Sequence, residues 1–380
     1  MIQFQLNDIQ EKLWNDLMTL VRTNEAFYYV DQKIGYKTYR IFSYRLASYT
    51  DFLQPNALEC RGHMFEVSCE GDDAQPLRMA SWVLPKFFNK DENPFTMDLN
   101  YNNPKQVMLK MDGSLISTFM HNNKVRLKSK TSLSSDQAVA AQKFLDSNEM
   151  YRLRFDIDVL VRSNFTVIME WTTPDNRIVI GYEKPNLTVL AVRHNGTGGF
   201  AYKEGFSKST ALQEHWVETF DIADMNEFVA SIPTMQGIEG YVLQLANSQF
   251  VKIKTLAYLS LHHAKDSINS PRRLYETVLD EASDDLRSLF AEDPLAIKQI
   301  GEMEQRVEKI YNHLVNVVET YYKDNKDLDR KSYAVKGQQE LTGLQFKLAM
   351  DKYLGRDVSY KEFMKKRWKE FGIKEEVKEE

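Results

Sequence analysis

The stretch QVMLKMDGS, residues 106–114, decides which kind of fold this chain adopts. It places Lys110, Asp112 and Gly113 between two apolar runs, QVMLKM (106–111) and LISTFM (115–120), that are typical of short β-strands. An Asp-Gly pair between two strands often forms a hairpin turn, and the lysine would then face solvent. The alternative is a reactive lysine at the end of a strand, and only the rest of the chain can decide between the two.

Further strand-like runs lie on both sides of this stretch, with polar turn clusters between them. They are HMFEVSC (63–69), KVRLKSK (124–130), TVIMEW (166–171), RIVIGY (177–182) and YVLQL (241–245). Helical patterns occur near residues 4–22, 134–147 and 210–221. This order predicts an α+β domain of antiparallel sheets flanked by helices.

The pattern changes after about residue 270, where apolar residues recur at spacings of three and four. The helical stretches cover residues 272–290, 295–323, 331–354 and 360–371. A chain of 380 residues is long enough for two domains. We therefore expect an N-terminal domain over residues 1–265 and an all-α C-terminal domain over residues 266–380.

The composition argues against several classes of protein. No apolar run approaches the roughly 20 residues of a membrane-spanning helix, and the N-terminus lacks the regions of a signal peptide. Cys60 and Cys69 are too few for a disulfide framework and lack partners at zinc-ligand spacing. The formal net charge of −5 counts mildly against nucleic-acid binding but allows a local basic cleft. We expect a cytoplasmic monomer that binds no membrane.

Several short motifs accompany Lys110 in a fixed order along the chain. They are Glu59-Cys60-Arg61-Gly62, Lys86-Phe87-Phe88-Asn89, Glu170, Glu239-Gly240-Tyr241-Val242 and Lys252-Ile253-Lys254. Together they resemble the motifs of the covalent nucleotidyltransferase superfamily of ligases and RNA capping enzymes. Longer runs are similar to the RNA ligases of T-even bacteriophages that repair cut tRNA. These runs are TYRIFSY (38–44), LECRG (58–62), ENPFTM (92–97), NRIV (176–179) and ASDDL (282–286), and the similarity covers nearly all of residues 30–290.

The resemblance implies an ATP-dependent RNA ligase in which Lys110 carries AMP. The expected substrates are ATP with Mg²⁺, and single-stranded RNA or broken tRNA in an infected bacterium. A DNA ligase or a capping guanylyltransferase would share the lysyl-nucleotide chemistry, and an RNA-binding module without activity is a further alternative. DNA ligases and capping enzymes usually carry a small β-barrel after Lys-x-Lys. Here the chain turns helical, which favours the RNA ligase.

The residue types suit this chemistry on physical grounds. An amine must be neutral to attack phosphorus, and only about 0.1% of a lysine with an ordinary pKa is neutral near pH 7.5. Nearby cations favour the neutral form and also hold a triphosphate. Arg61, Lys252 and Lys254 are the candidates, and the two lysines share one face because they are two apart on a strand. Glu170 and Glu239 lie at strand-like positions, where a structural salt bridge is the alternative role.

By resemblance each remaining site residue has an expected role. Tyr44 and Arg61 would contact the nucleotide, Lys86 its phosphates and Glu170 its ribose, while Glu239 and Asp284 would hold the metal. Gly113 and Gly240 would allow close approach of the backbone to the nucleotide, Phe88 would pack behind the site, and Asp112, Lys130 and Tyr258 would support it. Asp284 could equally be a helix N-cap or a surface charge.

The resemblance also assigns tRNA specificity to the C-terminal domain and leaves adenylylation to the N-terminal domain. Basic residues gather around Trp368, at Lys361 and over residues 365–369. This helical stretch could meet a phosphate backbone. Alternatively, Trp368 packs inward and the cations are simply solvated.

Overall fold

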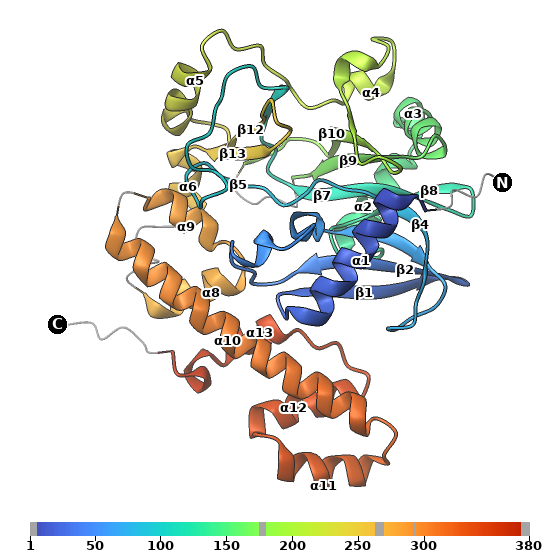
Figure 1. Ribbon diagram of the computed structural model, residues 1–380, viewed down its shortest axis with the longest axis vertical. Helices are drawn as coiled ribbons and strands as arrows, with labels where there is room; N and C mark the ends of the chain where they lie inside the picture. Colours follow the sequence, from blue (N-terminus) through green and yellow to red (C-terminus); the bar gives the residue numbers. More distant parts are fainter. Residues whose placement is uncertain (1–5, 175–179, 263–269, 292, 374–380) are drawn as a thin grey trace. The chain divides into compact units, whose positions relative to one another are not determined.

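The computed structural model describes residues 6–174, 180–262, 270–291 and 293–373. The chain forms two units, Met1–His262 and His263–Glu380. The first unit contains three sheets with helices around them, and the helices and strands are labelled in Figure 1. The described helices of the first unit are α1 (Asp8–Thr23), α2 (Asp136–Leu145), α3 (Tyr151–Arg162), α4 (Ala211–Glu214), α5 (Met225–Ser231) and α6 (Leu256–His262).

The N-terminal sheet is an antiparallel meander. Its order is β1 (Phe27–Ile34), β2 (Lys37–Tyr44), β3 (His63–Val67) and β4 (Pro76–Ser81). Helix α1 begins with a capping box between Asn7 and Gln10, which satisfies backbone donors at its first turn. Its apolar face, with Trp14 and Leu17, packs in one core with Phe42 and Phe65 of the sheet. This sheet supplies Tyr44, and the segment after β2 supplies Arg61.

The central sheet has five strands, and its two faces have different roles. Its order is β11 (Phe200–Ala201), β10 (Asn186–His194), β9 (Phe165–Thr172), β7 (Ser114–His121) and β8 (Lys124–Lys128). Trp171 of β9 contacts Phe144 of α2, with ring centroids 5.2 Å apart, so this face is covered by helices. Because side chains alternate along a strand, Glu170 points to the opposite face. The central sheet therefore separates its helical cover from the side that carries Glu170.

The third sheet carries Lys110 and the Lys-x-Lys motif. Its order is β5 (Phe88–Asn89), β13 (Phe250–Lys254), β12 (Gly240–Gln244) and β6 (Gln106–Leu109), with β5 parallel to β13 and the other pairs antiparallel. The register places Tyr241 opposite both Leu109 and Ile253. Lys110, Glu239 and Lys254 therefore lie together at one end of three neighbouring strands.

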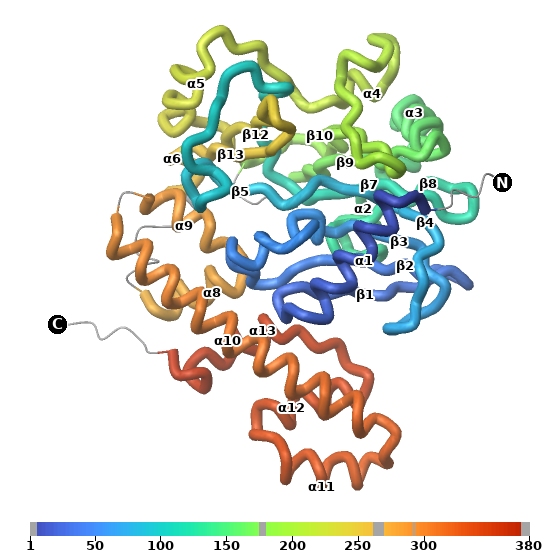
Figure 2. Tube along the Cα trace, in the orientation of Figure 1, coloured from blue at the N-terminus to red at the C-terminus, as the bar shows by residue number. Residues whose placement is uncertain are grey.

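All described elements of the second unit are helical. They are α8 (Pro271–Leu279), α9 (Ser283–Leu289), α10 (Pro294–Asn325), α11 (Arg330–Glu340), α12 (Gly343–Tyr353), α13 (Tyr360–Lys366) and a short 3-10 turn at Trp368–Phe371. The trace in Figure 2 shows α10 as the long helix of this unit, and α8, α9 and α12 contact it. With antiparallel sheets before it, this unit confirms the predicted α+β fold followed by an all-α region.

The cations near Trp368 are mostly neutralised inside this unit. Trp368 is only 7% exposed. Lys361 forms an ion pair with Glu281, Lys365 pairs with Asp280 and Glu362, and Arg367 pairs with Glu370. The arrangement favours the alternative in which Trp368 packs inward.

Some sequence expectations were wrong or incomplete. The predicted helix over residues 210–221 is limited to α4, because Trp216 and Thr219 form bridges to Val189 and Met108. The expected strand RIVIGY lies partly outside the described residues, and Ile180–Tyr182 are not in a strand. Helix α3 was not predicted, although buried Leu153, Ile157 and Val161 recur every four residues along it. No described helix is long and apolar enough to span a membrane.

Candidate active site

Lys110 is the first residue after β6, and the backbone of β12 holds it in place. Its N–H donates a hydrogen bond of 2.9 Å to the carbonyl oxygen of Gly240. Its Nζ lies 2.7 Å from Oε1 of Glu239, and its side chain is 21% exposed. The hairpin reading, with the lysine facing solvent, is therefore wrong.

Glu239 connects the two lysines of the site. Its side chain is 2% exposed, and its Oε1 also lies 3.0 Å from Nζ of Lys254. Its other oxygen, Oε2, has no hydrogen-bond partner among the described residues. A buried carboxylate oxygen without a partner is costly unless a ligand occupies it, and Mg²⁺ prefers such oxygens. Glu239 is therefore suited to the role of metal ligand that is expected of it.

No group of three or more potential ligands from His, Cys, Asp and Glu occurs in the part of the chain that the structure describes. A magnesium ion held by one or two carboxylates and by substrate phosphates does not need such a group. The donor set around Glu239 thus suits a metal that arrives with a nucleotide.

Asp112 holds the turn after Lys110. Its carboxylate accepts hydrogen bonds from the Ile180 N–H at 2.8 Å and the Tyr258 hydroxyl at 3.0 Å, and its own N–H donates to the Tyr182 hydroxyl at 3.0 Å. Asp112 is 3% exposed. The predicted pair Asp112 and Tyr258 is in contact, and both residues support the backbone of the site.

Tyr182 is a site residue that the sequence did not indicate. Its hydroxyl reaches the Asp112 backbone from 70 residues away. The sequence suggested only a strand-like run that ends at Tyr182, and such a run does not show which distant residue its hydroxyl contacts.

Gly113 brings the Lys110 turn against β9. Its N–H donates a 3.1 Å hydrogen bond to Oε1 of Glu170. A Cβ at this position would overlap the carbonyl oxygen of Trp171. Gly240 is crowded in the same way, because a Cβ there would overlap the carbonyl oxygen of Ile253 and its φ is +148°. At both positions a larger residue would collide with a backbone carbonyl oxygen. The approach of either glycine to a nucleotide stays a prediction.

Glu170 has an unusual proton affinity. Burial raises its pKa to about 7, with Glu239 adding to the effect and Lys110 and Arg61 opposing it. A carboxyl group that titrates near neutrality can donate or accept a hydrogen bond. It can therefore pair with a sugar hydroxyl in either role.

Lys110, Glu170 and Arg61 line a cavity of about 270 Å³. The other walls are mainly apolar and come from the central sheet, the third sheet and the loops next to them: Leu84, Phe87, Met108, Leu109, Met111, Leu115, Leu190, Val242 and Phe250. The Arg61 guanidinium lies 5.1 Å from the Phe87 ring centroid and donates a 3.3 Å hydrogen bond to the Pro85 carbonyl oxygen. Apolar walls with a few polar groups are typical of sites for flat, heteroaromatic ligands.

A second set of predicted residues gathers around Tyr44 and does not line this cavity. Nζ of Lys130 lies 4.2 Å from the Tyr44 ring centroid and Nζ of Lys86 lies 5.5 Å from it. Phe88 is 4% exposed and stacks on Phe95, which agrees with packing behind the site. Two lysines beside one ring form a cationic site suited to phosphates.

Lys252 and Lys254 are both half-buried on β13, as expected for two residues on one face of a strand. Asp284 belongs to the second unit and lies in the first turn of α9. Ala282 is the N-cap there, so the N-cap alternative for Asp284 is wrong. Its metal role stays a prediction.

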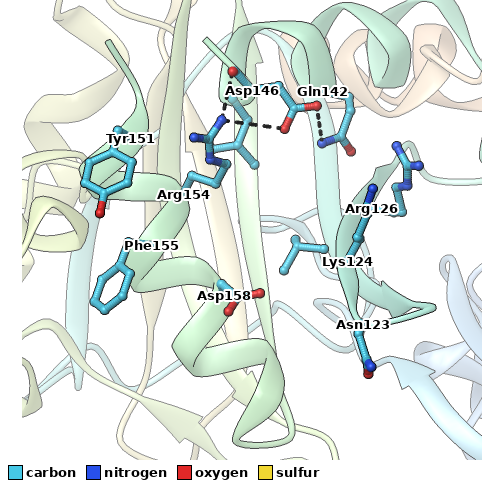
Figure 3. Close-up of a pocket in the computed structure, with 11 residues that line it drawn as sticks. Asn123, Lys124, Arg126, Gln142, Asp146, Tyr151, Arg154, Phe155 and Asp158 are labelled. Atoms are coloured by element: carbon cyan, nitrogen blue, oxygen red, sulfur yellow. Dashed lines mark hydrogen bonds and ion pairs between the residues drawn. The ribbon is translucent and has the colours of Figure 1, made fainter. Parts of the chain in front are cut away.

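A larger cavity, of about 440 Å³, lies elsewhere in the first unit (Figure 3). Lys124 and Arg126 line it from β8, and Tyr151 and Phe155 line it from α3. Because α3 covers the face of the central sheet opposite Glu170, this cavity is not part of the site around Lys110.

Residues 59–258, more than half of the chain, match the family described as RNA ligase, and residues 265–375 match the C-terminal domain of T4 RNA ligase 1. The chain belongs to this RNA ligase family.

Two relatives show the extent of the similarity. The chain is 24% identical over 253 residues to a putative RNA ligase of Thermovibrio ammonificans, covering 64% of each chain. It is 27% identical over 249 residues to RNA ligase 1 of bacteriophage TS2126, covering 63% of this chain and 60% of that one. The aligned region thus spans less than two thirds of either relative.

A solved structure of a putative ATP-dependent DNA ligase from Aquifex aeolicus is similar over 91% of this chain and 100% of that one, at 13% identity and a TM-score of 0.48.

Proposed function

We propose that this chain is an ATP-dependent RNA ligase that joins an RNA 5′-phosphate to an RNA 3′-hydroxyl through an AMP carried on Lys110. The observation that carries the proposal is the contact of Lys110 with Glu239 beside an apolar cavity closed by Glu170. Membership in the RNA ligase family supports the choice of RNA as the substrate.

The reaction has three displacements at phosphorus. Nζ of Lys110, after losing a proton, attacks the α-phosphorus of ATP, and the bond to pyrophosphate breaks. An oxygen of the RNA 5′-phosphate then attacks the same phosphorus and breaks its bond to Nζ, which gives a 5′–5′ pyrophosphate. Finally the 3′-hydroxyl oxygen attacks the RNA phosphorus, loses its proton, and AMP departs.

The cavity accounts for nucleotide binding. Its apolar walls suit adenine, and Glu170 suits the ribose because it lies on the same cavity as Lys110. Arg61 and Lys254 bring positive charge to where phosphates must lie for attack by Lys110. Lys86, Lys130 and Lys252 would extend this positive field toward the departing pyrophosphate or the RNA.

Glu239 has a double task in this proposal. In the free protein its Oε1 pairs with Nζ of both Lys110 and Lys254. Magnesium, held by Glu239 together with phosphate oxygens, would supply positive charge that offsets the triphosphate.

We further propose that residues 1–265 carry out adenylylation and that residues 266–380 select the RNA, a broken tRNA. The match of residues 265–375 to the C-terminal domain of T4 RNA ligase 1 supports this division. The same proposal places the enzyme, as a monomer, in the cytoplasm of an infected bacterium, and the phage relative supports that setting.

Labelling with ATP tests the proposal. Incubation with α-labelled ATP and magnesium should give a labelled protein band that is absent in Lys110→Ala. Lys105→Ala, a lysine on the segment before β6, is the matched control and should label normally. Persistent label in Lys110→Ala would show that another residue is the nucleophile. Comparing GTP with ATP, and nicked DNA with a 5′-phosphorylated RNA strand, separates an RNA ligase from a capping enzyme or a DNA ligase.

A further inference from the structure

Arg61 reaches the cavity from the loop between β2 and β3, and its own side chain is weakly held. The described hydrogen bond of its guanidinium is the 3.3 Å contact to the Pro85 carbonyl oxygen. The direction of Arg61 toward Lys110 and Glu170 therefore depends on how firmly its backbone is fixed. Two buried charged groups fix the residues on either side of it.

The first anchor is Glu59. Arg193 of β10 donates to both of its carboxylate oxygens, at 2.8 Å and 2.9 Å. Nε2 of His63 lies 2.7 Å from Oε2, and the Trp82 indole N–H donates to the same oxygen at 3.2 Å. Although burial alone would raise the pKa of Glu59, Arg193 and His63 outweigh it and hold that pKa well below its usual range. Glu59 is thus a fixed anion, two residues before Arg61.

The second anchor is Lys128 of β8. Its side chain is fully buried, and its Nζ donates to the carbonyl oxygen of Gly62 at 2.7 Å and to that of Ser129 at 3.2 Å. No carboxylate pairs with this ammonium among the described residues, and burial lowers its pKa to about 7. A buried lysine without a counter-charge is costly for folding. The Lys128 side chain therefore contacts Gly62, which follows Arg61, and Ser129, which precedes Lys130.

The backbone around Gly62 is tightly packed and hydrogen-bonded. Gly62 has a φ of +94°, and a Cβ there would lie 2.5 Å from the Lys130 carbonyl oxygen. Its N–H donates to the Phe42 carbonyl oxygen at 2.6 Å. Strands β10 and β8 lie on opposite sides of β9, which carries Glu170. The Arg61 loop is therefore attached to the central sheet on both sides of Glu170.

We propose that Lys128 is a positioning residue for Arg61, and that the Glu59–Arg193 ion pair completes the same support from the other side. Through Gly62, Lys128 sets the distance between Arg61 and the nucleotide. The proposal rests on the proposed function only in taking the cavity as the ATP site.

The test is the rate of lysyl-AMP formation as a function of ATP concentration. Lys128→Met keeps the shape of the side chain and removes the charge and the hydrogen bonds. We expect the half-saturating ATP concentration to rise about 10- to 100-fold, the usual effect of losing a supporting residue behind a site. The melting temperature should change little, because a buried unpaired charge is removed together with the bonds. Lys124→Met, an exposed lysine on the same strand, is the matched control.

A double-mutant cycle shows whether Lys128 acts through Arg61. In an Arg61→Ala background, Lys128→Met should change the half-saturating ATP concentration by less than about twofold. If the two effects multiply, or if folded Lys128→Met binds ATP as the wild type does, the proposal is wrong. Should Lys128→Met fail to fold, Arg193→Lys serves in the same cycle, because a lysine cannot hold both oxygens of Glu59.

The failure of this inference differs from the failure of the proposed function. If neither the wild type nor Lys124→Met forms lysyl-AMP, the proposed function is wrong. If both form it and Lys128→Met is indistinguishable from them, only the role of Lys128 is wrong.

Discussion

Lys110 and Glu239 form an ion pair with Nζ and Oε1 2.7 Å apart, at the point where β6 and β12 lie side by side. Oε1 of Glu239 also lies 3.0 Å from Nζ of Lys254. The same carboxylate has a second oxygen without a partner among the described residues. Glu239 thus uses one oxygen for the two lysines, and its other oxygen is the atom that we propose binds the metal.

Replacing Glu239 by Gln distinguishes two roles for this residue. If Glu239 holds the metal, the rate of lysyl-AMP formation should fall about 100-fold, as for the loss of a group that organises transition-state charge. If it only restrained Lys110, the rate would rise instead. The measurement is a time course of labelling with ATP at saturating magnesium. Glu227→Gln, on exposed α5, should behave as the wild type.

Replacing Gly113 by Ala tests the close approach of the Lys110 turn to β9. The added Cβ would overlap the Trp171 carbonyl oxygen, so backbone must move. We expect a loss of about 1–3 kcal/mol in the free energy of unfolding and a marked loss of adenylylation. Gly205→Ala is the control, because a Cβ there meets nothing within 4 Å. Unchanged stability and activity in Gly113→Ala would mean that the turn is looser than described.

The pKa of Glu170 predicts a pH-dependent stability. Because its folded pKa is about 7 and its ordinary value is 4.5, the folded state holds a proton that the unfolded state has released between these pH values. The free energy of unfolding should therefore fall as pH rises from about 4.5 to 7, and this contribution should be constant above pH 7. The substitution Glu170→Gln removes this pH-dependent contribution to the free energy of unfolding.

Chemical denaturation at pH 5 and pH 8 measures this effect. Relative to the wild type, Glu170→Gln should gain up to about 3 kcal/mol on going from pH 5 to pH 8, at 1.36 kcal/mol for each unit of pKa shift. A difference that stays constant with pH would show that Glu170 titrates normally.

Truncation near residue 270 tests the division of labour between the two units. The first unit contains its own cores and the whole cavity, so it should still form lysyl-AMP on Lys110. Some loss of rate is expected if Asp284, beyond the cut, holds a metal. Sealing of a broken tRNA should fall more than circularisation of an unstructured RNA strand. Equal losses on both substrates would mean that the helices support the catalytic fold and do not select RNA.

The sequence by itself determined the fold class and predicted the charged residues of the candidate site. Strand-like runs around Lys110 and helical periodicity after residue 270 can be recognised in the sequence. Both depend only on the spacing of apolar residues along the chain. The motifs are recognised by the type and the order of their residues, and they include Lys110, Glu170, Glu239 and Lys254. Helix α3 was missed although its periodicity is present in the sequence. The end of the helix predicted at residues 210–221 could not be foreseen, because bridges to distant strands override local preference there.

Only the tertiary structure decided which charges meet. Lys128 and Lys130 look alike in sequence, yet one is fully buried against Gly62 and the other lies beside the Tyr44 ring. Arg193 reaches Glu59 across 134 residues, and Tyr182 reaches Asp112 across 70. Such pairs depend on strand order and register, which bring together residues that no local pattern connects. For the same reason the sequence could name Arg61 as a functional cation, while what holds it in place became visible only in the folded chain.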